Sequence, residues 1–514
     1  MMQARIAHCT DAVSERLSRW WPIGLPLMVL CPTVILVTIH RFDGLYGQDS
    51  YAYWNYALGL LRDSLRLLGP LPHFFWPPGY PLLVALLSFV PLVGPHSGQM
   101  VSLLAGASVP IWTLQLAREV WGGDHSHDNS RVPLMAGLLV ALNGQLWQSS
   151  FVVMADTLGL AAGTLGMWAL VRYGRVRRAG WLLLAAGSLA WAILTRWAYA
   201  LVSIPAAAYA LWLLLHRDRR RALLSGFAAA LLAGAILWPV WRSAAEAVFA
   251  PSTGVVAFAA SLQVTPWNPL NALRREFIAP DGLLTYRLAN GLYYALTPAR
   301  SFFLTPIFLA LTLPGIWTVA RRRRAAPLFL LGGWIGIVYG FHAGSPVQNV
   351  RFTLAYLPPL AILAAVGTEE VVGRLSGLWR PVAMGVLLAG VAWMVIGGVW
   401  LTHGFVERMN RSKTMVPWVE AQIPADAHLL AFGMTATFQH ESRLDVRELY
   451  GMGEEDLLEV IQKEGPTYLI VDVQSVEQQW QGKSPADNYH WLRDGPGLTE
   501  MGTRDGYTLY RVEE

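Results

Sequence analysis

Four charged side chains stand at the edges of long apolar segments of this 514-residue chain: Asp49, Asp156, Arg196 and Arg351. A carboxylate can take the proton of a hydroxyl group that lies within hydrogen-bond reach. An arginine stays charged, and its planar guanidinium binds a phosphate through two parallel N–H groups. Together, the two residue types predict a reaction in which a hydroxyl attacks and a phosphate departs.

Four further arginines share one polar stretch and could also bind an anion: Arg274, Arg275, Arg287 and Arg300. Each of these charged residues also has a structural interpretation. The two aspartates can cap the helices that follow them. Arg196 and Arg351 can anchor the chain at the membrane interface, and the arginines of 274–300 can contact anionic lipid headgroups.

The composition is that of a membrane protein. Hydrophobic residues make up 54% of the chain and charged residues 14%, whereas soluble domains carry about 25% charged residues. The charges gather in short runs between apolar stretches of about 20 residues, the length that crosses the hydrocarbon core of a bilayer. The net charge of +5 arises from arginine-rich loops, which indicate orientation and not nucleic-acid binding.

The arginine clusters predict the orientation in an inner or plasma membrane, because short basic loops stay in the cytoplasm. Such clusters occupy the N-terminus and residues 172–178, 217–221 and 321–324. Placing all of them in the cytoplasm predicts about eleven transmembrane helices and an extracytoplasmic C-terminus. The predicted helices cover residues 21–40, 99–118, 132–151, 157–171, 181–195, 197–215, 222–242, 302–320, 327–342, 353–372 and 382–402.

Two long segments, 41–98 and 243–301, are then extracytoplasmic. The apolar piece 78–93 within the first is expected to lie on the outer leaflet, because a crossing there would reverse the orientation of every later arginine cluster. The second carries the arginines of 274–300 on the outer side, against the usual trend. Their placement predicts an anionic partner.

The composition changes after Thr402, so we expect a membrane domain over 1–402 and a small extracytoplasmic α/β domain over 403–514. Residues 428–432 and 467–472 read as buried strands. Residues 453–464 read as an amphipathic helix, with acids in its first turn and Gly465 at its end. Residues 506–511 read as a last strand.

Several short motifs, in order and on one predicted side, resemble those of the GT-C superfamily of membrane glycosyltransferases. The branch that includes protein O-mannosyltransferases and lipid A aminoarabinose transferases carries an acid in its first outer loop, which Asp49 matches, followed by a Pro-Pro stretch, which Pro77-Pro78 matches. Val153-Met-Ala-Asp-Thr157 resembles its second acidic site. Leu194-Thr-Arg-Trp197 resembles its Leu-Thr-Arg-Pro turn, with tryptophan in place of proline, and Arg351-Phe-Thr-Leu-Ala-Tyr-Leu-Pro358 resembles its Arg-Tyr…Leu-Pro element.

The resemblance implies a polytopic α-helical enzyme with the GT-C fold. It would move a hexose or pentose from a polyprenyl-phosphate donor to a protein, glycan or lipid acceptor on the extracytoplasmic face, with inversion. Asp49 would be the base, with Asp156 as a second catalytic acid. Arg351, with Arg196 or the arginines of 274–300, would bind the donor phosphate.

Aromatic residues near the Pro-Pro element are the candidates for a sugar or acceptor pocket, or else for packing and membrane belts: Tyr51, Tyr53, His73, Trp76 and Tyr80. Some superfamily members hold a divalent cation with paired acids, and Asp49 with Asp156 could bind Mg²⁺ or Mn²⁺ through their oxygens. No second acid adjoins Asp49, where Gln48 precedes and Ser50 follows. A metal-free site therefore remains the alternative.

Two other functions stay open at this point: a non-enzymatic transporter or flippase, and an inactive scaffold of the same fold. A transporter usually shows inverted repeats with Gly- or Pro-broken helices in matching positions, and the sequence shows none. The stretch 124–128, Asp-His-Ser-His-Asp, suggests a metal site. Its place in a predicted cytoplasmic loop favours a solvated turn instead.

Overall fold

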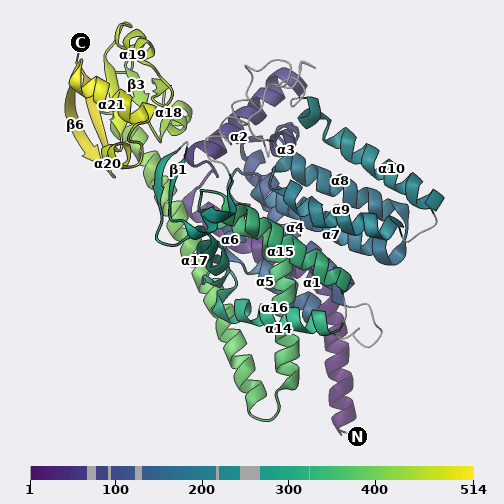
Figure 1. Cartoon of the computed structure of the whole chain (residues 1–514). Coiled ribbons are helices and arrows are strands. Elements are labelled where there is room, and N and C mark those ends of the chain that lie inside the picture. The colour runs from purple at the N-terminus through teal and green to yellow at the C-terminus, as the bar shows by residue number, and fades with distance from the viewer. Residues whose placement is uncertain are drawn as a thin grey trace.

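A helical body carries a smaller α/β domain at one end, and the N-terminus lies at the opposite end (Figure 1). The computed structural model describes residues 2–65, 77–90, 94–121, 130–215, 219–242, 267–279, 281–322 and 325–513. The predicted turn at 124–128 lies outside these residues. The principal helices of the body are α1 (Met2–His40), α4 (Ser97–Trp121), α5 (Val132–Ala141), α6 (Gly144–Ser150), α7 (Asp156–Val176), α8 (Ala179–Thr195), α9 (Tyr199–Leu215), α10 (Arg219–Ile236), α14 (Thr305–Arg321), α15 (Ala325–Gly344), α16 (Leu357–Arg374) and α17 (Trp379–Glu420).

The described helices confirm a membrane protein. Five apolar stretches are long enough to cross a bilayer: Trp21–His40, Ser97–Trp121, Ala326–Gly344, Val350–Arg374 and Trp379–Glu420. Four shorter apolar helices accompany them: Val132–Ala141, Ala179–Thr195, Tyr199–Leu215 and Leu223–Ile236. The number of eleven crossings stays a prediction.

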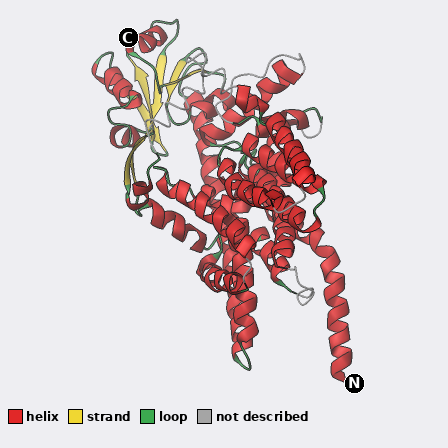
Figure 2. Ribbon diagram, turned by 45° about the vertical axis from the view of Figure 1, so that its right-hand side comes forward, coloured by secondary structure: helices red, strands yellow, loops and turns green. Residues whose placement is uncertain are grey.

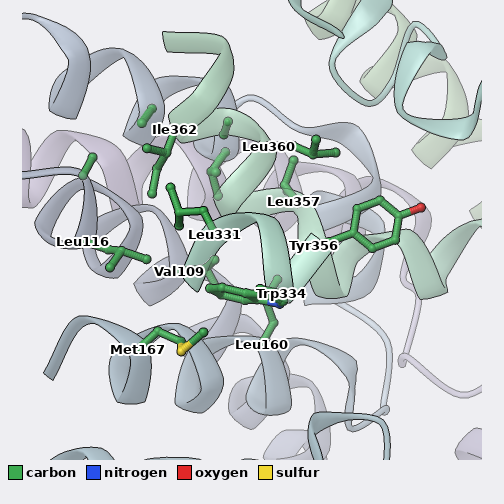
Figure 3. Packing of buried hydrophobic residues seen from close by; sticks show 14 of the residues in the cluster. Val109, Leu116, Leu160, Met167, Leu331, Trp334, Tyr356, Leu357, Leu360 and Ile362 are labelled. Carbon is green, nitrogen blue, oxygen red and sulfur yellow. The ribbon is translucent and has the colours of Figure 1, made fainter. Parts of the chain in front are cut away.

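Helix α16 forms the centre of the packing (Figure 3). Leu357 and Ile362 of α16 are fully buried, together with Trp334 of α15. The indole Nε1 of Trp334 donates a hydrogen bond of 2.7 Å to the carbonyl oxygen of Ala355, just before α16. A buried indole needs such a partner, and this bond fixes the position of the segment that precedes α16.

Basic residues gather at the ends of the helices that lie away from the α/β domain. Arg172 and Arg175, near the end of α7, donate to the buried carboxylate of Glu119 at 2.7 and 2.8 Å. Asp156 begins the same helix, and 21 helical residues rise about 30 Å. The arginine cluster and Asp156 are therefore separated by about the thickness of a bilayer core. The cytoplasmic side of the cluster remains a prediction.

One predicted helix is divided in the structure. Residues 132–151 were expected to form a single transmembrane helix, but α5 ends at Ala141 and α6 begins at Gly144. The break is stabilised by Asn143, whose side-chain oxygen accepts the Leu146 N–H at 2.9 Å. Periodicity could not reveal it because both pieces are apolar. Its consequence is the irregular stretch 151–155, which carries Met154 to the site described below.

The outer segments contain short elements: α2 (Gly47–Gly59), the π-helix η1 (Leu60–Leu65), α3 (Gly79–Leu87), η2 (Gly94–His96), η4 (Pro269–Leu273), β1 (Glu276–Ala279), β2 (Gly282–Thr285), α13 (Asn290–Leu296) and η5 (Thr297–Ala299). A further short helix, η6 (Val350–Tyr356), directly precedes α16. The predicted outer-leaflet helix corresponds to α3, which has nine residues and is too short to cross a bilayer. Gly79 lets α3 pack on the end of α8, because a Cβ there would lie 2.7 Å from the Leu194 carbonyl oxygen.

The α/β domain is joined to the body without a linker. We expected a transmembrane helix over 382–402, but α17 continues for 42 residues into the C-terminal domain. Its last turns supply Met415, Val416 and Val419 to that domain's core. The polar residues after Thr402 are the exposed side of the same helix, which explains why the change in composition suggested a boundary.

The C-terminal domain is a five-stranded sheet covered by helices (Figure 2). Strand order is β4-β3-β5-β7-β6, with β3 parallel to β4 and β5, and β7 antiparallel to β5 and β6. The strands are β3 (His428–Ala431), β4 (Asp445–Glu448), β5 (Thr467–Val471), β6 (Leu498–Arg504) and β7 (Tyr507–Val512); the helices are α18 (Thr435–Glu441), α19 (Glu454–Ile461), α20 (Val473–Gln478) and α21 (Ser484–Asp494). The three predicted strands and the predicted helix correspond to β3, β5, β7 and α19.

Candidate active site

Asp49 and Arg351 form an ion pair at the end of the body that faces the C-terminal domain. The Nη2 atom of Arg351 lies 2.8 Å from Oδ2 of Asp49. Asp49 stands in the first turn of α2, where its negative charge is favoured by the helix dipole. The Asn349 side chain caps η6 by accepting the Arg351 N–H at 3.1 Å, which fixes the backbone of Arg351. The Asp49 side chain is 36% exposed, so an incoming molecule can reach it.

Met154 contacts both the first outer segment and Arg351. Its sulfur lies 3.1 Å from Nη1 of Arg351 and 2.9 Å from the Tyr46 hydroxyl. A thioether is a weak acceptor, so Met154 occupies the space beside the guanidinium without neutralising its charge. Neither Met154 nor Tyr46 carries a sequence signal of its own, although Met154 is part of the motif that contains Asp156.

Asp156 and Arg196 form a second, more buried ion pair. Asp156 is the first residue of α7, and its side chain is 5% exposed. Arg196 follows α8 in an extended conformation, at the turn into α9. Burial lowers the pKa of the Arg196 guanidinium, and the positive charge of Arg351 lowers it further. The like charges of the two guanidiniums therefore interact.

The ring of Phe352 connects the two pairs. The guanidinium carbon of Arg196 lies 5.2 Å from the ring centroid, and that of Arg351 lies 5.5 Å from it. The imidazole of His342 stacks on the same ring at 4.9 Å. Cation–π contacts of this kind are worth about 0.5–1 kcal/mol each at exposed sites. Phe352 therefore holds two like charges near each other, a role that its place beside Arg351 in the sequence did not reveal.

The aromatic candidates separate into two groups. Tyr51 is fully buried, and its ring lies 5.3 Å from that of His440 in the C-terminal domain. Tyr53, two residues further along α2, packs edge-on against Tyr80 at 5.5 Å. Residues two apart in an α-helix are turned by about 200° and point in nearly opposite directions, so Tyr51 and Tyr53 do not line one pocket. His73 and Trp76 lie outside the described residues.

Two of these phenols serve as packing groups or hydrogen-bond donors. The Tyr80 hydroxyl donates to the Gly98 carbonyl oxygen at 2.9 Å and lies 3.0 Å from the Ser102 hydroxyl. Burial raises the pKa of Tyr53 to about 12. At neutral pH the Tyr53 phenol is therefore protonated and cannot act as a general base, which leaves the carboxylates for that role.

The arginines of the second outer segment take no part in these two pairs. Arg274, Arg275, Arg287 and Arg300 are exposed. Arg300 stacks on Tyr293 at 5.3 Å and on Phe302 at 5.9 Å. Within the described residues, none of the four forms an ion pair with Asp49 or Asp156. The geometry thus separates Arg351 and Arg196 from the other predicted phosphate ligands.

The part of the chain that the structure describes contains no set of side chains placed to bind a metal ion. No group of three or more His, Cys, Asp or Glu side chains is placed to hold a metal ion there. Asp49 and Asp156 are each already paired with an arginine, and a dication prefers several free oxygens. These two acids therefore do not fit a divalent cation as they stand, and the metal stays an untested prediction.

The helical bundle, the outer helices α2 and α3 and the terminal α/β domain form a fold that solved structures share, as the resemblance to the GT-C superfamily predicts. The chain is similar over 95% of its length, at 15% identity and a TM-score of 0.62, to the crystal structure of ArnT from Cupriavidus metallidurans bound to undecaprenyl phosphate, of which it covers 98%. No profile of a known protein family matches the chain, and no curated protein does.

Structures of oligosaccharyltransferase from Archaeoglobus fulgidus share the fold as well. In one, the enzyme is tethered to an acceptor peptide (TM-score 0.59, 12% identity, 96% of this chain and 74% of that one). In a second, the enzyme AglB is in complex with an inhibitory peptide and a dolichol-phosphate (TM-score 0.56, 13% identity, 97% of this chain and 75% of that one). These likenesses establish the fold, including the pairing of a membrane body with a terminal domain.

Proposed function

We propose that this protein transfers a sugar from a polyprenyl-phosphate carrier to an acceptor hydroxyl on the extracytoplasmic side of the membrane. The observation that carries the proposal is the 2.8 Å pair of Asp49 and Arg351, with Arg196 on the same phenylalanine ring. In this proposal Asp49 is the base, and Arg351 and Arg196 are the two phosphate ligands. The ArnT and AglB structures of the same fold hold undecaprenyl phosphate and dolichol-phosphate, which supports the choice of donor.

In the proposed reaction, the acceptor oxygen attacks the anomeric carbon of the donor sugar. The new bond joins that carbon to the acceptor oxygen, and the bond from the carbon to the phosphate oxygen breaks. Asp49 takes the hydroxyl proton. Arg351 and Arg196 bind the polyprenyl phosphate that leaves, because guanidinium groups stabilise charge that develops on phosphate oxygens. Attack opposite the leaving group inverts the anomeric configuration.

Because Asp49 is paired with Arg351, binding of the donor phosphate would release the Asp49 carboxylate to act as a base. A bound phosphate competes with Asp49 for the Arg351 guanidinium. When Arg351 turns to the phosphate, the carboxylate of Asp49 loses its partner and becomes free to accept a proton. Donor binding would therefore precede activation of the acceptor.

The test is a transfer assay with purified protein in liposomes. A panel of polyprenyl phosphates carrying radiolabelled hexoses or pentoses is offered together with an envelope extract as the acceptor source, and label in the non-lipid or glycolipid product is counted. We expect label transfer with one donor and its loss in Asp49→Asn. Movement of labelled donor across the bilayer without transfer, equal in both proteins, would favour the flippase alternative and reject the enzyme.

A further inference from the structure

The carboxyl ends of the parallel strands in the C-terminal domain face the outer segments of the membrane body. Glu448, the last residue of β4, accepts a hydrogen bond of 3.3 Å from the side chain of Gln48, which precedes Asp49. His440 of α18, the helix that follows β3, contacts Tyr51. Gln479, after α20, donates from its side chain to the Asp281 carbonyl oxygen at 2.7 Å. In Figure 1, α18 and α20 lie on the side of the domain nearest α2 and β1.

This edge is where open α/β sheets bind their ligands. The chain passes from β3 to β4 on one side and then to β5 on the other, so the direction of winding reverses next to β3. Ligands of such sheets bind at the reversal point, beyond the carboxyl ends of the strands. Here the end of β4 contacts the outer helix α2, because Glu448 accepts the Gln48 side chain and Gln48 precedes Asp49.

Two aromatic rings stand at the edge. The ring of Tyr450, which is 49% exposed, lies 5.8 Å from that of Trp480 at an angle of 74°. Trp480 is held edge-on by Phe432 at 4.9 Å. The second carboxylate oxygen of Glu448 accepts the Tyr450 N–H at 3.3 Å, so one side chain connects the tyrosine to the helix that carries Asp49. A buried tyrosine would be structural, but an exposed ring fixed in this way is available to a ligand.

The charges at this edge differ from those below it. Glu448 belongs to the C-terminal domain and Asp281 to the turn between β1 and β2 that contacts this domain, whereas Arg351 and Arg196 pair with Asp49 and Asp156 of the membrane body. Partial burial raises the pKa of the Asp281 carboxyl above its usual range, and the negative charge of Asp49 raises it further. Carboxylates accept hydrogen bonds and donate none when ionised. A ligand between them must bring donors such as hydroxyl groups, and a phosphate would be repelled.

We propose that Tyr450, Trp480 and Glu448 form the acceptor subsite and that the acceptor is a carbohydrate with an uncharged terminal ring. The aromatic faces cover the C–H face of a pyranose, and the lone pairs of Glu448 that remain free accept its hydroxyls. The ring then projects one hydroxyl towards Asp49. This inference rests on the proposed function, which places the acceptor at Asp49, and it names the acceptor class.

The test measures binding, so that its failure is separate from a failure of transfer. Full-length protein in nanodiscs is applied to an array of neutral and acidic oligosaccharides, and the affinity for the best-bound glycan is titrated. We expect neutral glycans to bind the wild-type protein. Their affinity should fall at least tenfold in Tyr450→Ala and in Glu448→Gln, and should stay within threefold of wild type in Tyr450→Phe. Trp480→Phe checks the second ring while keeping its contact with Phe432.

The matched control is Met501→Ala, an exposed residue on β6 at the far margin of the sheet, which should leave the affinity unchanged. Thermal melting of each variant identifies loss of folding. The proposal is overturned if no neutral glycan binds, if Tyr450→Ala binds as well as wild type, or if short peptides displace the glycans from the same site. Sugar transfer to a peptide could still occur in each of those cases, so the proposed function would stand.

Discussion

The side chains of Arg351 and Asp49 meet at 2.8 Å although 302 residues separate them in the chain. One comes from the short helix before α16 and the other from the first outer helix. Because these two elements are far apart in the chain, their contact requires the helices between them to be assembled. The site is therefore a property of the complete fold.

Removing the carboxylate of position 49 tests its role as the base. In Asp49→Asn we expect the transfer rate to fall by about 10²- to 10⁴-fold, the usual contribution of a general base, while binding of polyprenyl phosphate is kept. Asp43→Asn is the control, because Asp43 lies in the same segment but pairs with Lys413. Similar losses in the two variants would assign the effect to the fold of the segment.

Lysine at position 351 keeps the charge but loses the planar fork. In Arg351→Lys we expect kcat/KM for the donor to fall about 10- to 100-fold, and in Arg351→Gln to fall further. Steady-state kinetics with a fixed acceptor measures both. Arg300→Lys, an exposed arginine of the second outer segment, should change little. An equal effect of the two lysine variants would remove the special role of Arg351.

Phe352 is expected to be a positioning residue, since it contacts both guanidiniums. Loss of two cation–π contacts costs roughly 1–2 kcal/mol, so Phe352→Ala should raise the donor KM about 5- to 30-fold and change kcat less. Phe352→Tyr or Trp should restore the donor KM, whereas Phe352→Leu should not. A fall in kcat alone, with unchanged KM, would contradict this role.

The buried pair of Asp156 and Arg196 should be a stability determinant. Asp156→Asn leaves a buried guanidinium without a partner, which costs about 3–5 kcal/mol and should lower the melting temperature in detergent. The double variant Asp156→Asn with Arg196→Gln should melt above the single one, because no uncompensated charge remains. Additive losses in the double variant would show that the two residues act separately.

Chelation tests the divalent cation that the resemblance raised. Because each candidate acid is paired with an arginine, we expect EDTA treatment followed by gel filtration to leave transfer within twofold. Loss of transfer with EDTA that Mg²⁺ or Mn²⁺ restores would show that the ion pairs open to admit a cation.

The sequence predicted the charged residues of the candidate site better than the apolar residues that surround them. Asp49, Asp156, Arg196 and Arg351 drew attention because charges at the edges of apolar segments are costly and therefore informative. Their pairing partners could not be read, because each pair joins segments that no local pattern connects. Met154 and Phe352 escaped notice, since a methionine or phenylalanine in an apolar run looks like any core residue.

The helix boundaries predicted from the sequence were wrong where the residues on both sides of a boundary are equally apolar. The break at Asn143 interrupts two apolar helices, so no change in composition marks it. The opposite error occurred at Thr402, where a change in composition was interpreted as a change of structure, but α17 runs on. In both cases contacts in the folded structure determine where the helix ends. Asn143 caps α6, and the last turns of α17 pack in the core of the C-terminal domain.

The uninterrupted course of α17 makes the C-terminal domain a rigid extension of the membrane body. A helix of 42 residues is about 63 Å long, and each added residue turns whatever follows by about 100° and raises it by about 1.5 Å. The height of the domain above the bilayer and the direction it faces are thus set by counting residues along one helix. An inserted residue near His403 would therefore rotate and raise the C-terminal domain together, and would move Glu448 away from Gln48 without altering either residue.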